Sequence, residues 1–214
     1  MATTRNIIIG AANIFLTKSD STQAGYTIPD PFAVTTTGSF NDAANAAAGK
    51  ALDSTKWNNV GFTSDGLEVM YEPTYGEVEV DQQLDVAKLF KSSQRVMLKT
   101  TFTEATLRNL LIVFGLKESQ YSGADTAEES ILLGIGALNE EPTERALVAV
   151  GNAPRTSTGN NDRERIYYAR RVLSVESSSH SLKRNEATLF PVTFRLLGDP
   201  SYSDAYGKIV DRLN

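Results

Sequence analysis

Short runs of alternating hydrophobic and polar residues recur along most of the chain, and this period of two is typical of β-strands. Turn signals separate several runs, as at Ser64-Asp65-Gly66 and at Pro73-Thr74-Tyr75-Gly76. We predict strands at residues 6–16, 67–71, 77–82, 95–102, 130–135, 145–150, 166–175 and 187–197, with residues 201–214 as an arm or final strand. The pattern therefore predicts a mainly β protein.

The strictest alternation is at Glu77-Val78-Glu79-Val80-Asp81. A period of two places Glu77, Glu79 and Asp81 on one side of a strand and both valines on the other. We expect the valines to pack inside the protein and the three carboxylates to form an acidic face.

One segment, residues 104–114, has a helical period. Leu107, Leu110, Leu111 and Phe114 stand at i, i+3, i+4 and i+7, which predicts one buried face. Thr103 is the expected N-cap, and Gly115 the expected C-terminal stop. Many strands and one amphipathic helix favour a two-sheet β-sandwich or barrel with a flanking α-helix.

Residues 17–56 break the pattern, because Thr, Ser, Ala, Asn, Asp and Gly dominate there. This stretch is much longer than an ordinary connection. It is either a disordered linker or a long functional loop that becomes ordered against a partner. We interpret residues 1–214 as a single domain with a long loop or insertion at about 17–56.

Composition narrows the possible functions. The chain has 214 residues, no cysteine and a formal net charge of −5. The lack of cysteine excludes thiol catalysis, cysteine-ligated zinc and disulfides, and the acidic balance disfavours general attraction to nucleic acid. No apolar run approaches the ~18 residues of a membrane-spanning helix, so we expect no membrane association.

Candidate chemistry is sparse. His180 is the only histidine, and no G-x-S-x-G or phosphate-binding loop accompanies it. Gly134-Ile135-Gly136 lacks the third glycine of a dinucleotide site. A flat acidic strand face does not surround a cation. A basic cluster at residues 163–171, interleaved with tyrosines, indicates either nucleic-acid contact or, as we favour, a strand face paired with acids. We expect no enzyme activity, metal or cofactor.

Two stretches carry a family resemblance. Residues 57–82, WNNVGFTSDGLEVMYEPTYGEVEVDQ, combine an aromatic residue, a turn, a hairpin and an acidic-valine alternation that ends near Asp-Gln. Residues 95–115 continue with a strand and the helix EATLRNLL. In this order they resemble tail tube proteins (major tail proteins) of long-tailed bacteriophages. The long insertion before Trp57 departs from the family pattern.

The resemblance implies a structural virion protein with a two-sheet sandwich and a flanking helix. Six subunits would form a ring, and stacked rings would form the tail tube, bridged by a long loop and the terminal arms. The implied partners are further copies of the chain and the tape-measure, tail terminator and baseplate or tip proteins. DNA would cross the lumen without specific binding. The implied location is the virion tail, assembled in the host cytoplasm.

Three alternatives remain at this point. In the tube, Glu77, Glu79 and Asp81 either line the lumen, where carboxylates repel DNA, or meet outside solvent or the arginines of an adjacent subunit. The whole chain could instead be another β-sandwich virion component, such as a capsid decoration or tail-adhesion module. A β-sandwich hydrolase is the third class, and a single histidine argues against it.

Overall fold

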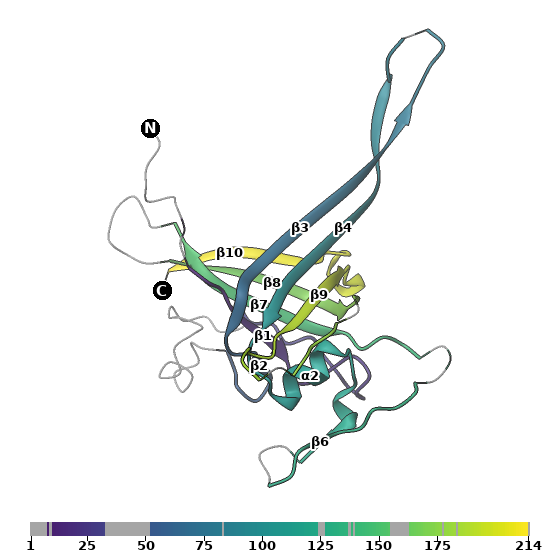
Figure 1. The fold of residues 1–214 in the computed structure, drawn as a ribbon. Helices are drawn as coiled ribbons and strands as arrows, with labels where there is room; N and C mark the ends of the chain where they lie inside the picture. The colour runs from purple at the N-terminus through teal and green to yellow at the C-terminus, as the bar shows by residue number, and fades with distance from the viewer. Residues whose placement is uncertain are drawn as a thin grey trace.

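The computed structural model describes residues 8, 10–32, 52–82, 84–123, 127–136, 138, 140–154, 163–176, 178–182 and 184–213. One antiparallel sheet of eight strands dominates it, in the order β2-β1-β7-β8-β9-β4-β3, with β10 paired to β8 (Figure 1). A two-stranded sheet, β5-β6, lies apart. The mainly β prediction with one flanking helix is confirmed, although the main sheet does not close into a barrel.

The strands are β1 (Asn13–Thr17), β2 (Trp57–Asn59), β3 (Thr63–Val78), β4 (Lys88–Phe102), β5 (Tyr121–Ser122), β6 (Ser130–Ile131), β7 (Arg145–Ala153), β8 (Arg163–Ser174), β9 (Phe190–Leu197) and β10 (Gly207–Leu213). The helices within the described residues are α2 (Leu107–Val113) and two 3₁₀ turns, η2 (Glu118–Gln120) and η3 (Pro200–Tyr202). The predicted terminal strand is therefore confirmed as β10. The strand predicted at residues 130–135 is wrong beyond Ile131. The strand predicted at residues 6–16 begins only at Asn13, and its residues 6, 7 and 9 lie outside the described residues.

The sheet branches at β8. One edge of β8 pairs with β7, whereas the other pairs with β10 from Arg163 to Ala169 and then with β9 from Arg171 to Ser174. The branch lets β9, β4 and β3 fold over β1, β7 and β8 (Figure 1). Two halves of one sheet thus take the place of the two separate sheets of a sandwich.

Alternation along β1, β7 and β8 buries side chains on both faces of these strands. Ile14 and Leu16 of β1 point to the main core, while Phe15 between them points to a second core. The main core also contains α2 and the following residues of the other strands: Leu98, Phe102, Leu147, Ala149, Ala169, Val172, Phe190, Val192, Phe194 and Leu196. The second core contains Trp57, Val148, Ile166 and Tyr168.

The described part of the predicted 17–56 loop covers the second core. Ile28 and Phe32 pack against it, the Tyr168 hydroxyl donates to the Pro29 carbonyl at 3.1 Å, and Phe32 contacts the Tyr168 ring edge-on. The linker interpretation is therefore wrong for residues 18–32. Residues 33–51 lie outside the described residues, and the single-domain organisation stays a prediction.

β3 and β4 form one long hairpin that projects from the body (Figure 1). The predicted turn at Pro73–Gly76 is wrong, because β3 continues through it. Proline is tolerated here since β3 is the last strand of the sheet order and its outer edge needs no N–H donor. Gly76 leaves room for the Phe90 ring, which lies across it 2.6 Å from where a Cβ would stand.

The other turn signal becomes a bulge. Asp65 and Gly66 adopt φ values of 62° and 69°, and the β3–β4 register shifts between Ser64 and Leu67. Aspartate and glycine are residues that tolerate this left-handed conformation. The Ser64-Asp65-Gly66 signal therefore predicts the left-handed backbone conformation correctly, but the chain forms a bulge there and does not reverse direction.

The helix is shorter than predicted and turned by about one position. Thr106, not Thr103, caps it, by accepting a hydrogen bond from the Asn109 amide at 3.2 Å. Its fully buried residues are Asn109, Leu111, Ile112 and Val113. Of the four residues predicted to be buried, Leu111 is fully buried, and Leu107 and Leu110 are half-buried. The prediction is wrong for Phe114, which is 41% exposed.

Buried Asn109 explains the rotation. Its side-chain amide donates to the carbonyl oxygens of Val60, at 2.8 Å, and Glu104, at 2.9 Å. This ties the helix to the chain that enters the hairpin. Gly115 ends the helix as predicted, at φ 64°, with its amide bonded to Ile112 and that of Leu116 to Leu111.

We expect Leu111→Ala to lower the free energy of unfolding by roughly 2–5 kcal/mol, because the side chain is fully buried in the main core. Urea unfolding of both proteins measures the change. Phe114→Ala is the matched control on the same turn and should cost less, because Phe114 is partly exposed. Equal losses for the two variants would contradict this orientation of the helix.

Candidate assembly surfaces

The hairpin leaves long strand edges without partners. β4 pairs with β9 only from Met97 to Phe102, so its edge from Lys88 to Val96 is unpaired among the described residues. The whole outer edge of β3 is unpaired in the same part of the chain. Unpaired edges are templates for pairing with another chain. The hairpin therefore offers backbone hydrogen-bonding groups to a partner along its length.

One face of the hairpin is largely apolar. Cross-strand pairing places the side chains of Val69, Tyr71, Tyr75, Leu89, Val96 and Leu98 on one side, together with those of Glu77, Lys91 and Gln94, and we call this side the inner face. Near the body this face joins the main core through Leu98. Farther out it is uncovered, with Tyr71 54% and Leu89 59% exposed. The side of the sheet that faces the core near the body thus continues along the hairpin, where no core residues cover it.

Lys91 is the cation on this face. Its ammonium group donates to the Tyr71 hydroxyl at 2.7 Å and to the Gln94 side-chain oxygen at 2.6 Å. The hydrogen bond to Tyr71 raises the pKa of Lys91. Both of these contacts are neutral, so Lys91 presents a full positive charge to any partner.

The predicted acidic residues lie at the hairpin tip. Glu77 is the penultimate residue of β3, whereas Glu79 and Asp81 follow the strand, and all three are exposed. The expectation that Val78 and Val80 pack inside is wrong, because they are 41% and 37% exposed. The alternation predicts the strand correctly as far as Val78, but the strand has left the body by then and has no core to enter.

β10 provides a second edge. Among the described residues it pairs with β8 alone, so its other edge has no strand partner. Ile209 is 63% exposed on it. Gly207 lies so close to β8 that an added Cβ would stand 1.8 Å from the Tyr168 carbonyl oxygen. The start of β10 is therefore fixed on β8 while its outer edge stays available.

An exposed apolar segment follows β6. We call residues 131–136 and 138 the apolar arm; its side chains Leu132, Leu133, Ile135 and Leu138 are 71%, 70%, 107% and 96% exposed. Full burial of one such side chain contributes about 1.5–3 kcal/mol, so leaving four in water is costly. Exposed apolar groups gathered in this way mark an interaction site. The run ILLGIGAL is the sequence signal for it, and the prediction of a strand there misses it.

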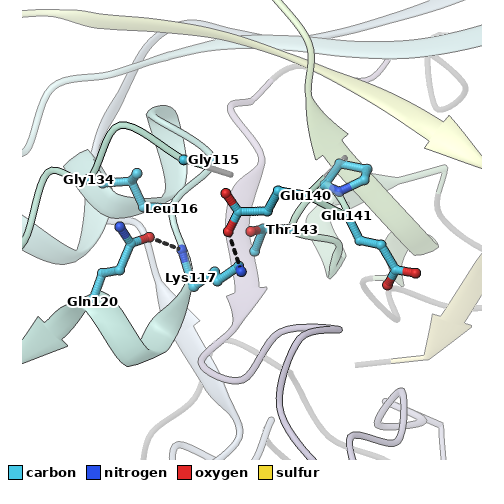
Figure 2. A pocket seen from close by; sticks show the side chains of 10 residues that line it. Gly115, Leu116, Lys117, Gln120, Gly134, Glu140, Glu141 and Thr143 are labelled. Carbon is cyan, nitrogen blue, oxygen red and sulfur yellow. Dashed lines mark hydrogen bonds and ion pairs between the residues drawn. The ribbon is translucent and has the colours of Figure 1, made fainter. Parts of the chain in front are cut away.

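Polar contacts hold the base of the arm (Figure 2). Gln120 and Leu132 exchange two hydrogen bonds, one backbone and one from the Gln120 side chain, at 2.9 and 3.0 Å. Lys117 forms an ion pair with Glu140 across a cavity of about 510 Å³. The arm is thus fixed at both ends and presents its apolar residues to a partner.

A buried charge cluster anchors this region to the sheet. Arg145 is 5% exposed and donates to the carbonyl oxygens of Thr17, Lys18 and Leu116 at 3.0–3.2 Å. Asp20 and Glu118 each lie 3.5 Å from its guanidinium. Burial lowers the pKa of Arg145, and the two carboxylates oppose that shift. One side chain therefore connects β1, β7, the segment after α2 and the loop after β1.

Three arginines of the basic cluster of β8 are paired with acids, as the charged-face interpretation predicted. Arg165 pairs with Asp211 at 2.7 Å, Arg170 with Asp199 at 2.5 Å and Arg171 with Glu144 at 2.6 Å. The hydrogen bond from Arg170 holds the pKa of Asp199 below its usual value. These arginines are therefore neutralised within the chain.

Other candidate chemistry is not assembled into a site. The His180 ring lies near the rings of Phe190 and Phe114, with centroids 4.8 and 6.1 Å away and the ring planes tilted. Across the described parts of the chain, no group of three or more His, Cys, Asp or Glu is placed to hold a metal ion. No helix within those parts has the length and apolarity to cross a membrane.

A comparison with protein families supplies the decisive observation: a family model described as phage tail tube protein matches residues 12–211. This chain belongs to the phage tail tube protein family. No curated protein matches its sequence. The match extends from β1 into β10, so it includes both free edges, the projecting hairpin and the apolar arm. The tail tube protein is a structural component of the virion tail and not an enzyme.

Proposed function

We propose that this tail tube protein closes into hexameric rings, and that the rings stack into the conduit through which DNA leaves the virion. The observation that carries the proposal is the unfinished sheet. It exposes the edges of β3, β4 and β10 within one subunit. Pairing each edge with the next copy removes an aggregation hazard and repeats one contact around a closed ring.

The hairpin supports contacts beyond a single ring. It extends well past the body (Figure 1), so a tip held in one ring can reach the next. In this proposal the tube also contacts tape-measure, tail terminator and baseplate or tip proteins at its lumen and ends. Assembly takes place in the host cytoplasm. The alternative of a capsid decoration or tail-adhesion module has no such support from the family match.

Electron microscopy of the purified protein, together with sedimentation over a range of concentrations, tests the proposal. We expect a shift from monomer to hexameric rings or open-ended tubes as the concentration rises. A protein that stays monomeric at every concentration, or that forms closed particles of another symmetry, would contradict it.

The role of the acidic tip remains a prediction with two arrangements. If Glu77, Glu79 and Asp81 line the lumen, replacing all three with lysine should leave tubes intact, because these side chains are exposed. DNA ejection should then slow, most strongly at low salt where screening is weak. Normal ejection from assembled mutant virions at low ionic strength would remove these residues from the lumen. Failure to assemble would place them at a contact between subunits.

A further inference from the structure

The β3–β4 ladder is interrupted at the root of the hairpin, where β3 begins and β4 ends. Ser64 pairs with Thr101, and the next paired residue of β3 is Leu67, opposite Thr100. Residues 65–66 are thus two extra residues on β3 without a counterpart on β4. If they were absent, the ladder would be continuous and Leu67 would still lie opposite Thr100. The pairing of the hairpin therefore does not need this bulge.

The backbone at the root is strained. Gly61, Asp65 and Gly66 have φ values of 80°, 62° and 69°, in the left-handed region. An aspartate is less comfortable there than a glycine, because its Cβ approaches the following carbonyl oxygen. Strain that a fold keeps where a regular ladder was available points to a function.

A buried hydrogen bond holds the bulge in place. The Thr100 side chain is in a residue only 3% exposed, and its hydroxyl donates to the Gly66 carbonyl oxygen at 2.8 Å. Thr100 lies on β4, so the contact fixes the bulged part of β3 against the strand that it leaves. The bulge is therefore built into the fold and is not a loose end of the strand.

A second set of contacts holds the chain just before β3. The Phe62 amide donates to the Glu104 carboxylate at 2.9 Å, and its carbonyl accepts from the amide and hydroxyl of Thr103 at 3.0 and 2.8 Å. The Glu104 carboxyl group fills the space that a Cβ on Gly61 would need. These contacts do not serve to bury Phe62, which is 81% exposed. They fix the backbone at the start of β3.

The root determines how β3 lies on β4, and so how the hairpin points. β4 is tied to the body through β9 from Met97 to Phe102, whereas the outer edge of β3 has no strand partner among the described residues. A bulge bends its strand and increases the local twist. Residues 67–78, at about 3.3 Å each, form an arm of about 40 Å, so a turn of roughly 10° at the root moves the tip by about 7 Å. The whole projecting part of the hairpin lies beyond this point (Figure 1).

We propose that the bulge at residues 65–66, held by Thr100 and Glu104, sets the direction in which the hairpin meets a neighbouring copy of this chain. The contact with a neighbour rests on the proposed function, but the direction of the hairpin is a property of the single subunit. Thr100 and Glu104 are then positioning residues, which act on that contact only through the hairpin.

Deleting Asp65 and Gly66 tests this role. Combined with Thr100→Val, the deletion leaves the ladder in register and leaves no buried hydroxyl unpaired, so we expect a folded monomer that melts close to the unmodified protein. Spin labels on Ser54→Cys and Gln82→Cys, both exposed, report the distance from the body to the tip in a chain that has no other cysteine. We expect pulsed electron paramagnetic resonance to show that this distance shifts by several ångströms, and electron microscopy to show no rings or tubes.

Deleting Leu84 and Asp85 from the tip is the matched control, because it removes the same number of residues and leaves the root unchanged. That variant should still form tubes. Normal tubes from the bulge deletion, or an unchanged distance between its labels, would overturn the inference. If the unmodified protein forms no tubes while the label distance shifts as expected, only the proposed function is contradicted.

Glu104→Ala tests the same role without changing the chain length, in case the deletion does not fold. It removes the acceptor of the Phe62 amide, so we expect a broader distribution of label distances and fewer tubes. Glu104→Gln keeps a side-chain oxygen as acceptor and should restore both. Identical distances in all three proteins would show that the root contacts do not direct the hairpin, whatever the yield of tubes.

Discussion

Arg145→Met is expected to lower the free energy of unfolding by about 3–5 kcal/mol, the usual cost of removing one partner from a buried ion pair. The substitution leaves the carboxylates of Asp20 and Glu118 beside an apolar side chain. It also removes the donor to three carbonyl oxygens, those of Thr17, Lys18 and Leu116. Urea unfolding followed by circular dichroism measures the loss.

Arg165→Met is the matched control. Its partner Asp211 is also a carboxylate, but the two side chains are 28% and 30% exposed. Partly exposed ion pairs contribute about 0–1 kcal/mol, so this variant should unfold nearly like the unmodified protein. A small effect of Arg145→Met, no larger than that of Arg165→Met, would mean that water reaches the cluster.

Removing the outer hairpin is expected to abolish tube formation while leaving a folded subunit. The variant deletes residues 72–95 and joins Tyr71 to Val96, which are paired across the hairpin, through an Asn-Gly turn. The pairing of β4 with β9, from Met97 to Phe102, is retained. The subunit should therefore keep its core and lose most of the projecting edges and the outer part of the inner face.

Thermal unfolding of the monomer and electron microscopy measure these two effects separately. A shorter deletion, which replaces residues 79–87 by the same turn between paired Val78 and Lys88, is the control for changing the loop alone. Normal tubes from the longer deletion would contradict the role given to the hairpin. An unfolded product would show that the hairpin also stabilises the monomer.

Periodicity predicts most of the strands because their burial is local. Along β7 and β8, residues from Ala146 to Val150 and from Ile166 to Ala169 are flanked on both faces by apolar cores, and the sequence there is correspondingly apolar. It fails at Pro73–Gly76, where the chain stays extended because β4 pairs alongside it and Phe90 of β4 packs across Gly76. Turn propensity is a local quantity and contains no information about a ring that packs across a glycine.

The candidate surfaces are harder to predict for a related reason. The alternation from Glu77 to Asp81 predicts that one side of the strand is buried, but this holds only where the strand packs against a core. Only the length of the hairpin reveals that Val78 is beyond the body. For the helix, the apolar stripe allows two faces, and the hydrogen bonds of buried Asn109 to Val60 and Glu104 select the observed one. In both cases the outcome depends on parts of the chain that are distant in sequence.

The pairing of β1 with β7 has a consequence for how the protein is made. Phe15 lies opposite Val148, so nearly the whole stretch between these strands must be synthesised before the centre of the sheet can form. Non-local pairing of this kind slows folding, and incomplete chains expose strand edges while they wait. The β3–β4 hairpin, in contrast, joins neighbours in sequence and can form early. A nascent subunit would thus possess its assembly hairpin before its core, which makes premature association between growing chains the main hazard in its synthesis.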